Sequence, residues 1–332
     1  MAQPLSTSSS DLGRLSRSIL TALVLLVAFE TALAFVPENV MIRTMHWMRR
    51  LLVREPAAAV QIHGDSVSQG ALLASEIEKA LPPGMRVVNA SLQGSGPEFT
   101  YFLFKRQVES GRVPGSILIA HSPHTFVTHR MGVLVGAFLG WSEMPEAFLH
   151  GRHFFDTLYG VLCKLSFTLR HREELSDLVK GRRGAIRTWE DPLPTEQWVR
   201  AAGAADEAKW AREGKSPAGP LHPVYLRGFA VDPGEHAFLA RTLALARARN
   251  VRVYWLTLPE HEAVAAARDS FGFETAYYGF VDSLAARGEI TLLQREFEVL
   301  PASEFGDYTH LRLRAALRLS REVGEKIGAG VR

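Results

Sequence analysis

The sequence predicts an α/β protein with a parallel sheet, a helical insertion and one apolar N-terminal helix. From residue 56 onward, short apolar segments alternate with longer segments of helical periodicity. Residues 130–225 interrupt this alternation without a clear strand pattern, and residues 18–36 form the one strongly apolar stretch. Strands that alternate with helices are typical of βαβ units, in which neighbouring strands run parallel.

The composition indicates a folded globular chain. The 332 residues are 47% hydrophobic and suffice for one large domain, or for one domain with an insertion. A net charge of +3 without a long basic run gives no sign of nucleic-acid binding, so we expect no nucleic-acid partner. The single cysteine, Cys163, excludes an intramolecular disulfide and a Cys-rich metal site, and we expect it to be a small buried apolar residue.

The apolar N-terminal stretch has three interpretations. Residues 1–17 form a tail, and residues 18–36 contain a single charge, Glu30. As a helix, that stretch would span about 28 Å, close to the thickness of the bilayer hydrocarbon, which favours a transmembrane anchor. The small residues Ala32 and Ala34, on either side of Leu33, would instead suit the cleavage site of a signal peptide, and a buried helix of a soluble protein is the third interpretation. Glu30 counts against both membrane interpretations unless it is protonated or paired with a partner helix.

The main domain is expected over residues 56–328. Strands are predicted at 58–62, 86–90, 116–120, 251–258 and 289–293, and helices at 69–81, 97–110, 234–249, 273–287 and 311–327. Pro97 stands at a first helical position, where proline is favoured. Residues 130–225 are aromatic at first, then charged and rich in Gly and Pro, and we interpret them as an insertion or cap over the sheet.

A serine follows the first predicted strand almost at once, in the segment Gly64-Asp65-Ser66. The carboxyl edge of an open α/β sheet is where such folds place their sites. The start of the next helix there offers backbone N–H groups to a developing oxyanion. The alternative is an ordinary turn in which Ser66 or Ser68 caps the helix.

A second motif, Asp307-Tyr308-Thr309-His310, directly precedes the last predicted helix. A serine hydroxyl needs a base to take its proton, and histidine is the usual base near neutral pH. A carboxylate fixes the tautomer of that histidine and stabilises the imidazolium. The alternative is that Asp307 caps the final helix and His310 packs against it.

Together these motifs resemble those of the SGNH/GDSL hydrolase superfamily. The stretch from Val87 to Pro97 is similar to the family's second block, in which the N–H of a glycine, by position Gly94, helps to bind the oxyanion. The resemblance implies a flavodoxin-like three-layer α/β/α fold and ester chemistry through a serine acyl-enzyme, without cofactor or metal. It assigns Ser66 as nucleophile, His310 as base and Asp307 as its partner, with the Ser66 and Gly94 N–H groups in the oxyanion hole.

The third block departs from the family pattern, which usually ends in Gly-x-Asn-Asp. Here the third strand is followed by His121-Ser122-Pro123-His124. His124 falls near the position of the asparagine, and a neutral imidazole could replace its oxyanion donor. Equally, His124 could have a structural role, could contact the substrate, or could mark a silent site.

The remaining histidines and aromatic residues are interpreted more plainly. We expect His63 to be a solvated or capping side chain, with a position that reaches the site as the alternative. The spacing of His121, His124 and His129 matches no recurring metal motif, so no metal is expected. The aromatic part of the insertion is expected to serve mostly as packing, with an acyl-chain or carbohydrate groove over the serine as the alternative; its members are Phe138, Trp141, Phe148, Phe154, Phe155 and Tyr159.

The leading hypothesis is a membrane-anchored serine esterase or O-acyltransferase that acts on acyl esters, acetyl esters above all, of a cell-envelope or exported carbohydrate. The alternative is a silent relative that binds a glycan or a membrane acyltransferase partner. A soluble lipase-like enzyme is disfavoured by the apolar N-terminus. We expect a single-pass membrane protein with its main domain outside the cytoplasm. The distribution of arginines does not favour that orientation, because those after the apolar stretch outnumber those before it. The expected orientation therefore rests on the resemblance alone.

Overall fold

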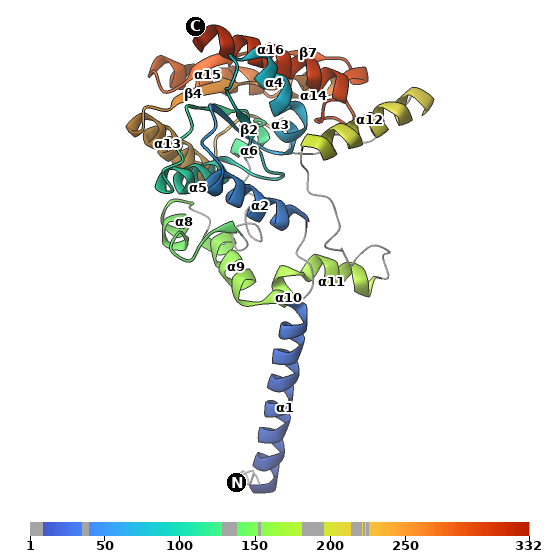
Figure 1. Cartoon of the computed structure of the whole chain (residues 1–332). Helices are drawn as coiled ribbons and strands as arrows, with labels where there is room; N and C mark the ends of the chain where they lie inside the picture. Colours follow the sequence, from blue (N-terminus) through green and yellow to red (C-terminus); the bar gives the residue numbers. More distant parts are fainter. Residues whose placement is uncertain are drawn as a thin grey trace.

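The computed structural model describes residues 9–34, 40–127, 138–151, 154–180, 196–213, 221, 223 and 226–331. Its centre is a five-stranded sheet in the order β2-β1-β3-β4-β6 (Figure 1). The strands are β1 (Val60–His63), β2 (Val87–Asn89), β3 (Ser116–Ile119), β4 (Arg252–Leu256) and β6 (Thr291–Gln294). Every neighbouring pair is parallel, which confirms the predicted α/β class and its parallel sheet.

Helices cover both faces of this sheet. One face packs against α5 (Pro97–Glu109), α13 (Pro233–Ala248) and α15 (Phe273–Ala286), and the other against α3 (Ser66–Ala71), α4 (Ala74–Ala80) and α16 (Leu313–Val331). Strand β3 shows why both faces are covered. Ile117 and Ile119 join the first apolar cluster, whereas Leu118 joins the second, because successive side chains of a strand point to opposite faces.

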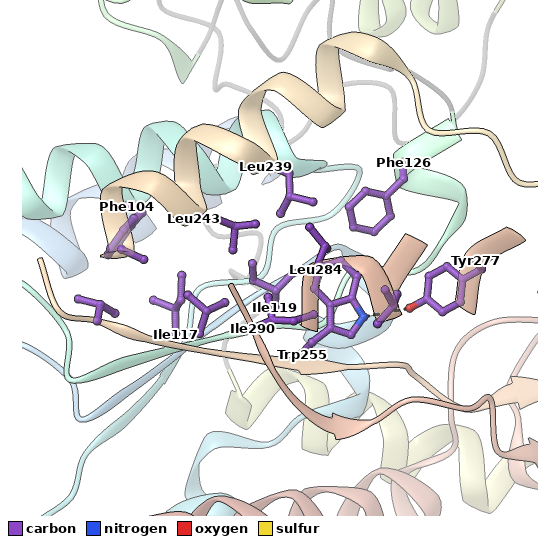
Figure 2. Packing of buried hydrophobic residues seen from close by; sticks show 14 of the residues in the cluster. Phe104, Ile117, Ile119, Phe126, Leu239, Leu243, Trp255, Tyr277, Leu284 and Ile290 are labelled. Atoms are coloured by element: carbon purple, nitrogen blue, oxygen red, sulfur yellow. Dashed lines mark hydrogen bonds between the residues drawn. The ribbon is translucent and has the colours of Figure 1, made fainter. Parts of the chain in front are cut away.

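The larger cluster lies between the sheet and α13, as Figure 2 shows. Trp255 of β4 and Tyr277 of α15 are both almost fully buried there. The Trp255 indole N–H donates to the Tyr277 hydroxyl at 3.1 Å, and that hydroxyl also meets Thr257 Oγ1 at 3.1 Å. The two large rings therefore contribute apolar burial without leaving a polar atom unsatisfied.

The helix expected at 69–81 is in fact two helices, α3 and α4, which is a correction to the prediction. The chain leaves the helical conformation at Leu72 and Leu73. Asn89 Nδ2 donates to the Leu72 carbonyl at 2.6 Å, and the Leu73 N–H donates to Ser320 Oγ at 2.8 Å. Hydrogen bonds from distant residues thus replace the helical ones at the break.

The insertion is helical, and no strand occurs in those of its residues that the structure describes. Its helices are α8 (Met144–His150), α9 (Phe154–Leu165), α10 (Phe167–Arg170), α11 (Arg172–Val179) and α12 (Glu196–Glu213), and α6 (His124–Val127) lies just before it. Only α12 lies beside α3 and α4, whereas α8 to α11 lie at the other end of the body (Figure 1). The expected cap over the site is thus α12 alone. Cys163 is buried in α9, as predicted.

The N-terminal segment forms α1 (Ser9–Leu33), which projects from the body beneath α10, and α2 (Val40–Arg54) (Figure 1). Part of the predicted tail, from residue 9 on, is therefore helical. Among the described residues, no helix combines the length and the apolar character needed to span a bilayer. The anchor expected at 18–36 thus finds no support, and Phe35 and Val36 lie outside the described residues.

The last elements support the C-terminal loop. Strands β5 (Glu260–His261) and β7 (Val299–Leu300) pair in parallel as a separate small sheet. Helix α14 (Glu262–Asp269) follows β5, and the 3₁₀ turn η2 (Ala302–Glu304) follows β7. This small sheet brings the chain to the loop that carries Asp307 and His310.

Candidate active site

Ser66 is the first residue of α3, and only Gly64 and Asp65 separate it from the end of β1. The order of the sheet reverses between β1 and β3, and open α/β sheets bind their ligands at such a switch point. The turn is tightly packed at Gly64. A Cβ atom there would lie 2.0 Å from Ser68 Oγ and 2.7 Å from the Ala120 carbonyl oxygen, so only glycine fits.

Asp65 holds the serine turn in place, a role that the sequence analysis did not assign. Its side chain is almost fully buried. Oδ1 accepts the N–H of Val67 at 2.9 Å and that of Ser68 at 3.4 Å. Oδ2 accepts the Ser122 N–H at 3.0 Å and also the Ser122 hydroxyl. One carboxylate therefore caps α3 and ties it to the end of β3. The signal was present in the sequence, because aspartate is a preferred N-cap residue.

The loop after β2 is attached to the same turn. The Leu92 N–H and the Ser95 hydroxyl both donate to the Gly64 carbonyl, at 3.0 and 2.7 Å. Between them lies Gly94, which is partly exposed and has φ +70°. The structure thus brings the second block beside the serine turn, as the resemblance implies.

The two oxygens of the Asp307 carboxylate have different hydrogen-bond partners. Oδ1 accepts the N–H groups of Thr309 at 2.7 Å and His310 at 2.8 Å, together with the Thr309 hydroxyl at 2.9 Å. These bonds fix the shape of the loop. Oδ2 remains for the His310 ring and meets its Nδ1 at 2.7 Å.

The other ring nitrogen of His310 faces the serine. Nε2 lies 3.2 Å from Ser66 Oγ, within hydrogen-bond reach. The structure therefore brings Ser66, His310 and Asp307 together, as the sequence analysis expected. The site is open to solvent, since the side chains of His310 and Asp307 are 42% and 53% exposed.

Electrostatics favour the charged form of both loop residues. Desolvation alone would lower the pKa of His310, but the hydrogen bond and charge of Asp307, with a contribution from Asp65, raise that pKa above its ordinary value. Desolvation would raise the pKa of Asp307, yet its hydrogen bond to His310, the charge of that ring and the backbone donors lower it strongly. Asp307 is thus ionised at neutral pH and stabilises an imidazolium.

Aromatic packing supports the loop from behind. The His261 ring at the end of β5 lies 5.2 Å from the Phe305 ring and 5.1 Å from the Tyr308 ring, centre to centre. Phe305 is fully buried. The small sheet therefore anchors the loop on both sides of Asp307.

A cavity of about 450 Å³ opens over the three residues. One wall comes from α12, through Val199, Ala202, Gly203 and Asp206. Asp206 accepts from Arg312 Nη1 at 2.8 Å, which ties α12 to the chain just after His310. The remaining lining is Ser66, Gln69, Gly70, Gln93, Gly306, Asp307, His310, Leu311, Arg312 and Leu313. The contribution of α12 could not be predicted, because its sequence carries no catalytic motif.

His124 lies at the start of α6, after β3, and its Nε2 is 3.5 Å from Ser122 Oγ. Ser122 itself donates its N–H and its hydroxyl to Asp65, so Ser122 connects the third block to the serine turn. The roles of Gly94 and His124 in an oxyanion hole stay predictions.

His63 differs from its expected role. It is neither solvated nor capping but completely buried, and neither ring nitrogen has a hydrogen-bond partner in the described part of the chain. Desolvation, with a smaller contribution from the nearby His121 charge, lowers its pKa to about 3. His121 is also buried and meets Thr100 Oγ1 through Nε2 at 2.8 Å. Both rings are therefore neutral core residues.

The other predictions concern metal and aromatic residues. No group of three or more His, Cys, Asp or Glu side chains suited to a metal ion occurs among the described residues, and His129 lies outside them. The described residues that line the cavity include none of the aromatic residues of α8 and α9. An aromatic groove over the serine is therefore not what the structure shows; α12 forms that wall instead.

The chain was also compared with known proteins. No protein-family model matches it. No curated protein matches it significantly.

Proposed function

We propose that the protein is a serine-dependent esterase or O-acyltransferase of the SGNH type. The observation that supports this most directly is the line of hydrogen bonds from Ser66 Oγ through the His310 ring to Asp307 Oδ2, at 3.2 and 2.7 Å. The five parallel strands lie in the order β2-β1-β3-β4-β6. Since β6 is the fifth strand of this sheet along the chain, this is the flavodoxin-like order 2-1-3-4-5, which further supports the resemblance.

In the proposed reaction, Ser66 Oγ attacks the ester carbonyl while His310 Nε2 takes its proton. The tetrahedral intermediate collapses to an acyl-enzyme, and the imidazolium gives its proton to the departing alcohol. Water or a sugar hydroxyl then attacks the acyl-enzyme while His310 takes its proton. The bond between Ser66 Oγ and the acyl carbon breaks, and the imidazolium returns the proton to Ser66 Oγ. Asp307 keeps the proton of the neutral ring on Nδ1. The N–H groups of Ser66 and Gly94, with His124, are the proposed oxyanion donors, each typically worth about 3 kcal/mol.

The cavity supports a substrate that is partly apolar. Val199, Ala202, Leu311 and Leu313 line it, with polar side chains at Gln69 and Gln93. An acyl chain suits the apolar wall, and the polar side suits hydroxyl groups of a carbohydrate. We therefore propose acyl esters of an envelope or exported carbohydrate as the substrate class, with acetyl as the simplest acyl group.

The test is reaction with a fluorophosphonate, which labels activated serines, combined with turnover of a chromogenic acetyl ester. The wild-type protein should be labelled at Ser66 and should release the chromophore. Ser66→Ala should lose both, while Ser283→Ala, an exposed serine of α15, should keep both. Circular dichroism would check that both variants fold.

Failure of the wild-type protein to label would count against the enzyme. It would favour the second hypothesis, a silent relative that binds a glycan or a membrane acyltransferase. Full turnover by Ser66→Ala would show that another residue is the nucleophile.

A further inference from the structure

Helix α1 exposes apolar side chains around its whole circumference. Leu23, Val24, Leu25, Leu26 and Val27 are consecutive, and each is more than half exposed. Successive helical residues are turned by about 100°, so five in a row face every direction. A protein groove would cover one face of a helix, at spacings of three and four residues. A helix that is apolar all round requires an apolar medium on every side.

Helix α9 exposes its large apolar side chains, whereas a typical surface helix buries them. Its large apolar side chains Phe154, Phe155, Leu162 and Leu165 are 59%, 81%, 42% and 67% exposed. The residues that it buries are small or polar: Thr157, Gly160 and Cys163. An ordinary surface helix buries its large apolar residues. We call the exposed side chains of Leu149, Phe154, Phe155, Leu162 and Leu165 the foot surface.

The foot surface is continuous with the base of α1, and Glu30 makes the junction. Glu30 Oε1 accepts the Ser166 hydroxyl at 2.8 Å, and Oε2 accepts the N–H groups of Phe167 at 2.6 Å and Thr168 at 3.2 Å. These donors lie directly after Leu165, the last residue of α9. The one charge of the apolar stretch therefore binds the start of α10 in its own chain. It does not require the partner helix that the sequence analysis considered.

Basic and interfacial side chains accompany these apolar ones. Lys164 Nζ lies 5.6 Å from the centre of the exposed Trp141 ring. The charges of Arg170, Arg106 and Arg49 act on the same lysine, and one acidic side chain, Glu143, opposes them. Tryptophan and lysine are enriched at the level of lipid headgroups, and clustered cations favour anionic lipids.

We propose that the foot surface and α1 together bind an anionic lipid bilayer. Helix α1 enters the acyl chains from one side, and α9 lies at the level of the headgroups. The basic side chains there meet lipid phosphates. Helices α3 and α12, which line the catalytic cavity, lie farther from α1 than α9 does (Figure 1), so the cavity faces the aqueous phase.

The first experiment places an environment-sensitive nitrobenzoxadiazole probe on α9. The probe is attached at Leu162→Cys in a Cys163→Ala background, with Val299→Cys on β7 as the matched exposed control. Full-length protein is mixed with phosphatidylcholine vesicles that contain phosphatidylglycerol. We expect a blue shift and higher intensity at position 162, a smaller change with phosphatidylcholine alone, and no change at position 299.

The second experiment measures vesicle partition by flotation. Phe155→Glu with Leu162→Glu should weaken partition at least about tenfold, because burying each side chain is worth more than 1.4 kcal/mol. Val299→Glu, also exposed, should leave partition unchanged. If the protein floats with the vesicles but the emission of the probe at position 162 does not change, α1 binds the bilayer alone. That result would overturn the role of α9. If the emission of the probe changes with protein concentration in the absence of lipid, the foot surface binds a second copy of this chain instead of a bilayer. Neither readout depends on ester chemistry, so these results stand apart from the proposed function.

Discussion

Replacing Asp307 with asparagine separates two roles of the carboxylate. One oxygen holds the shape of the loop, and the other orients the His310 ring. In the native loop, Oδ1 accepts from Thr309 and from the His310 N–H, and an amide oxygen can accept the same bonds. The amide nitrogen would then stand where Oδ2 lies, 2.7 Å from His310 Nδ1. Because that nitrogen is a donor, Nδ1 must become the acceptor and the proton moves to Nε2. A protonated Nε2 cannot take the proton of Ser66.

The expected loss is large and has a distinct pH signature. A wrong tautomer in such a triad lowers kcat by about 10⁴-fold, or about 5.4 kcal/mol in the barrier. In the wild-type protein, Asp307 raises the pKa of His310 above 6.5, so activity falls as pH drops through a value above 6.5, where the base becomes charged. Without the negative partner the imidazolium is less stable, so in the variant the acid limb moves to lower pH.

The assay is turnover of a chromogenic acetyl ester against pH, with the free energy of unfolding measured in parallel. Asp282→Asn, which makes the same chemical change at a surface pair with Arg295, is the control and should keep wild-type turnover. Retention of more than a tenth of wild-type kcat by Asp307→Asn, or an acid limb that does not move, would refute this reasoning.

Three further predictions concern the turn, the cavity wall and the attachment of α12. Gly64→Ala should destabilise the protein by about 1–3 kcal/mol in denaturant unfolding, because its Cβ would collide with Ser68 Oγ; an unchanged midpoint would contradict the packing. Ala202→Phe should raise KM for long-chain esters more than for acetyl ester, since it narrows the cavity, and equal changes would place the acyl chain elsewhere. Glu76 of α4 pairs with Arg200 of α12, at 2.9 Å from Oε1 to Nη2. Its hydrogen bonds, first to Lys79 and then to Arg200 and Arg321, lower the pKa of Glu76 to about 2, so its stabilisation of the fold is present above pH 4.5 and is lost as pH falls toward 2. Glu76→Gln should cost on the order of 2 kcal/mol at neutral pH, with a shallower loss in acid, as thermal unfolding would show.

The sheet and the three catalytic candidates could be predicted because local signals carry them. Apolar runs such as residues 116–120 predict buried strands, and all five expected strands occur. Ser66 follows a strand and His310 precedes a helix, so the topology alone brings both to one edge of the sheet.

Other features depend on contacts that no local pattern encodes. The break at Leu72 and Leu73 exists because Asn89 and Ser320 supply hydrogen bonds from distant elements. His63 is buried because β1 is an internal strand between β2 and β3, although histidine is more often found partly exposed. The wall formed by α12 depends on pairs such as Asp206 with Arg312, which lie 106 residues apart.

The meeting of the two distant motifs has a physical cause in the helices that follow them. Ser66 begins the α3–α4 segment, and His310 lies three residues before Leu313, where α16 begins. Helices α4 and α16 pack so closely that a Cβ on Gly324 would lie 2.8 Å from both the Ala80 Cβ and the Ile77 carbonyl oxygen. Ser320 of α16 adds hydrogen bonds to both sides of the α3–α4 junction, at the Ala71 carbonyl and the Leu73 N–H. Once these two helices dock on one face of the sheet, the start of each is fixed relative to the other. The distance of 3.2 Å between His310 Nε2 and Ser66 Oγ is therefore a consequence of the packing of these helices in the core. It does not depend on a flexible surface loop.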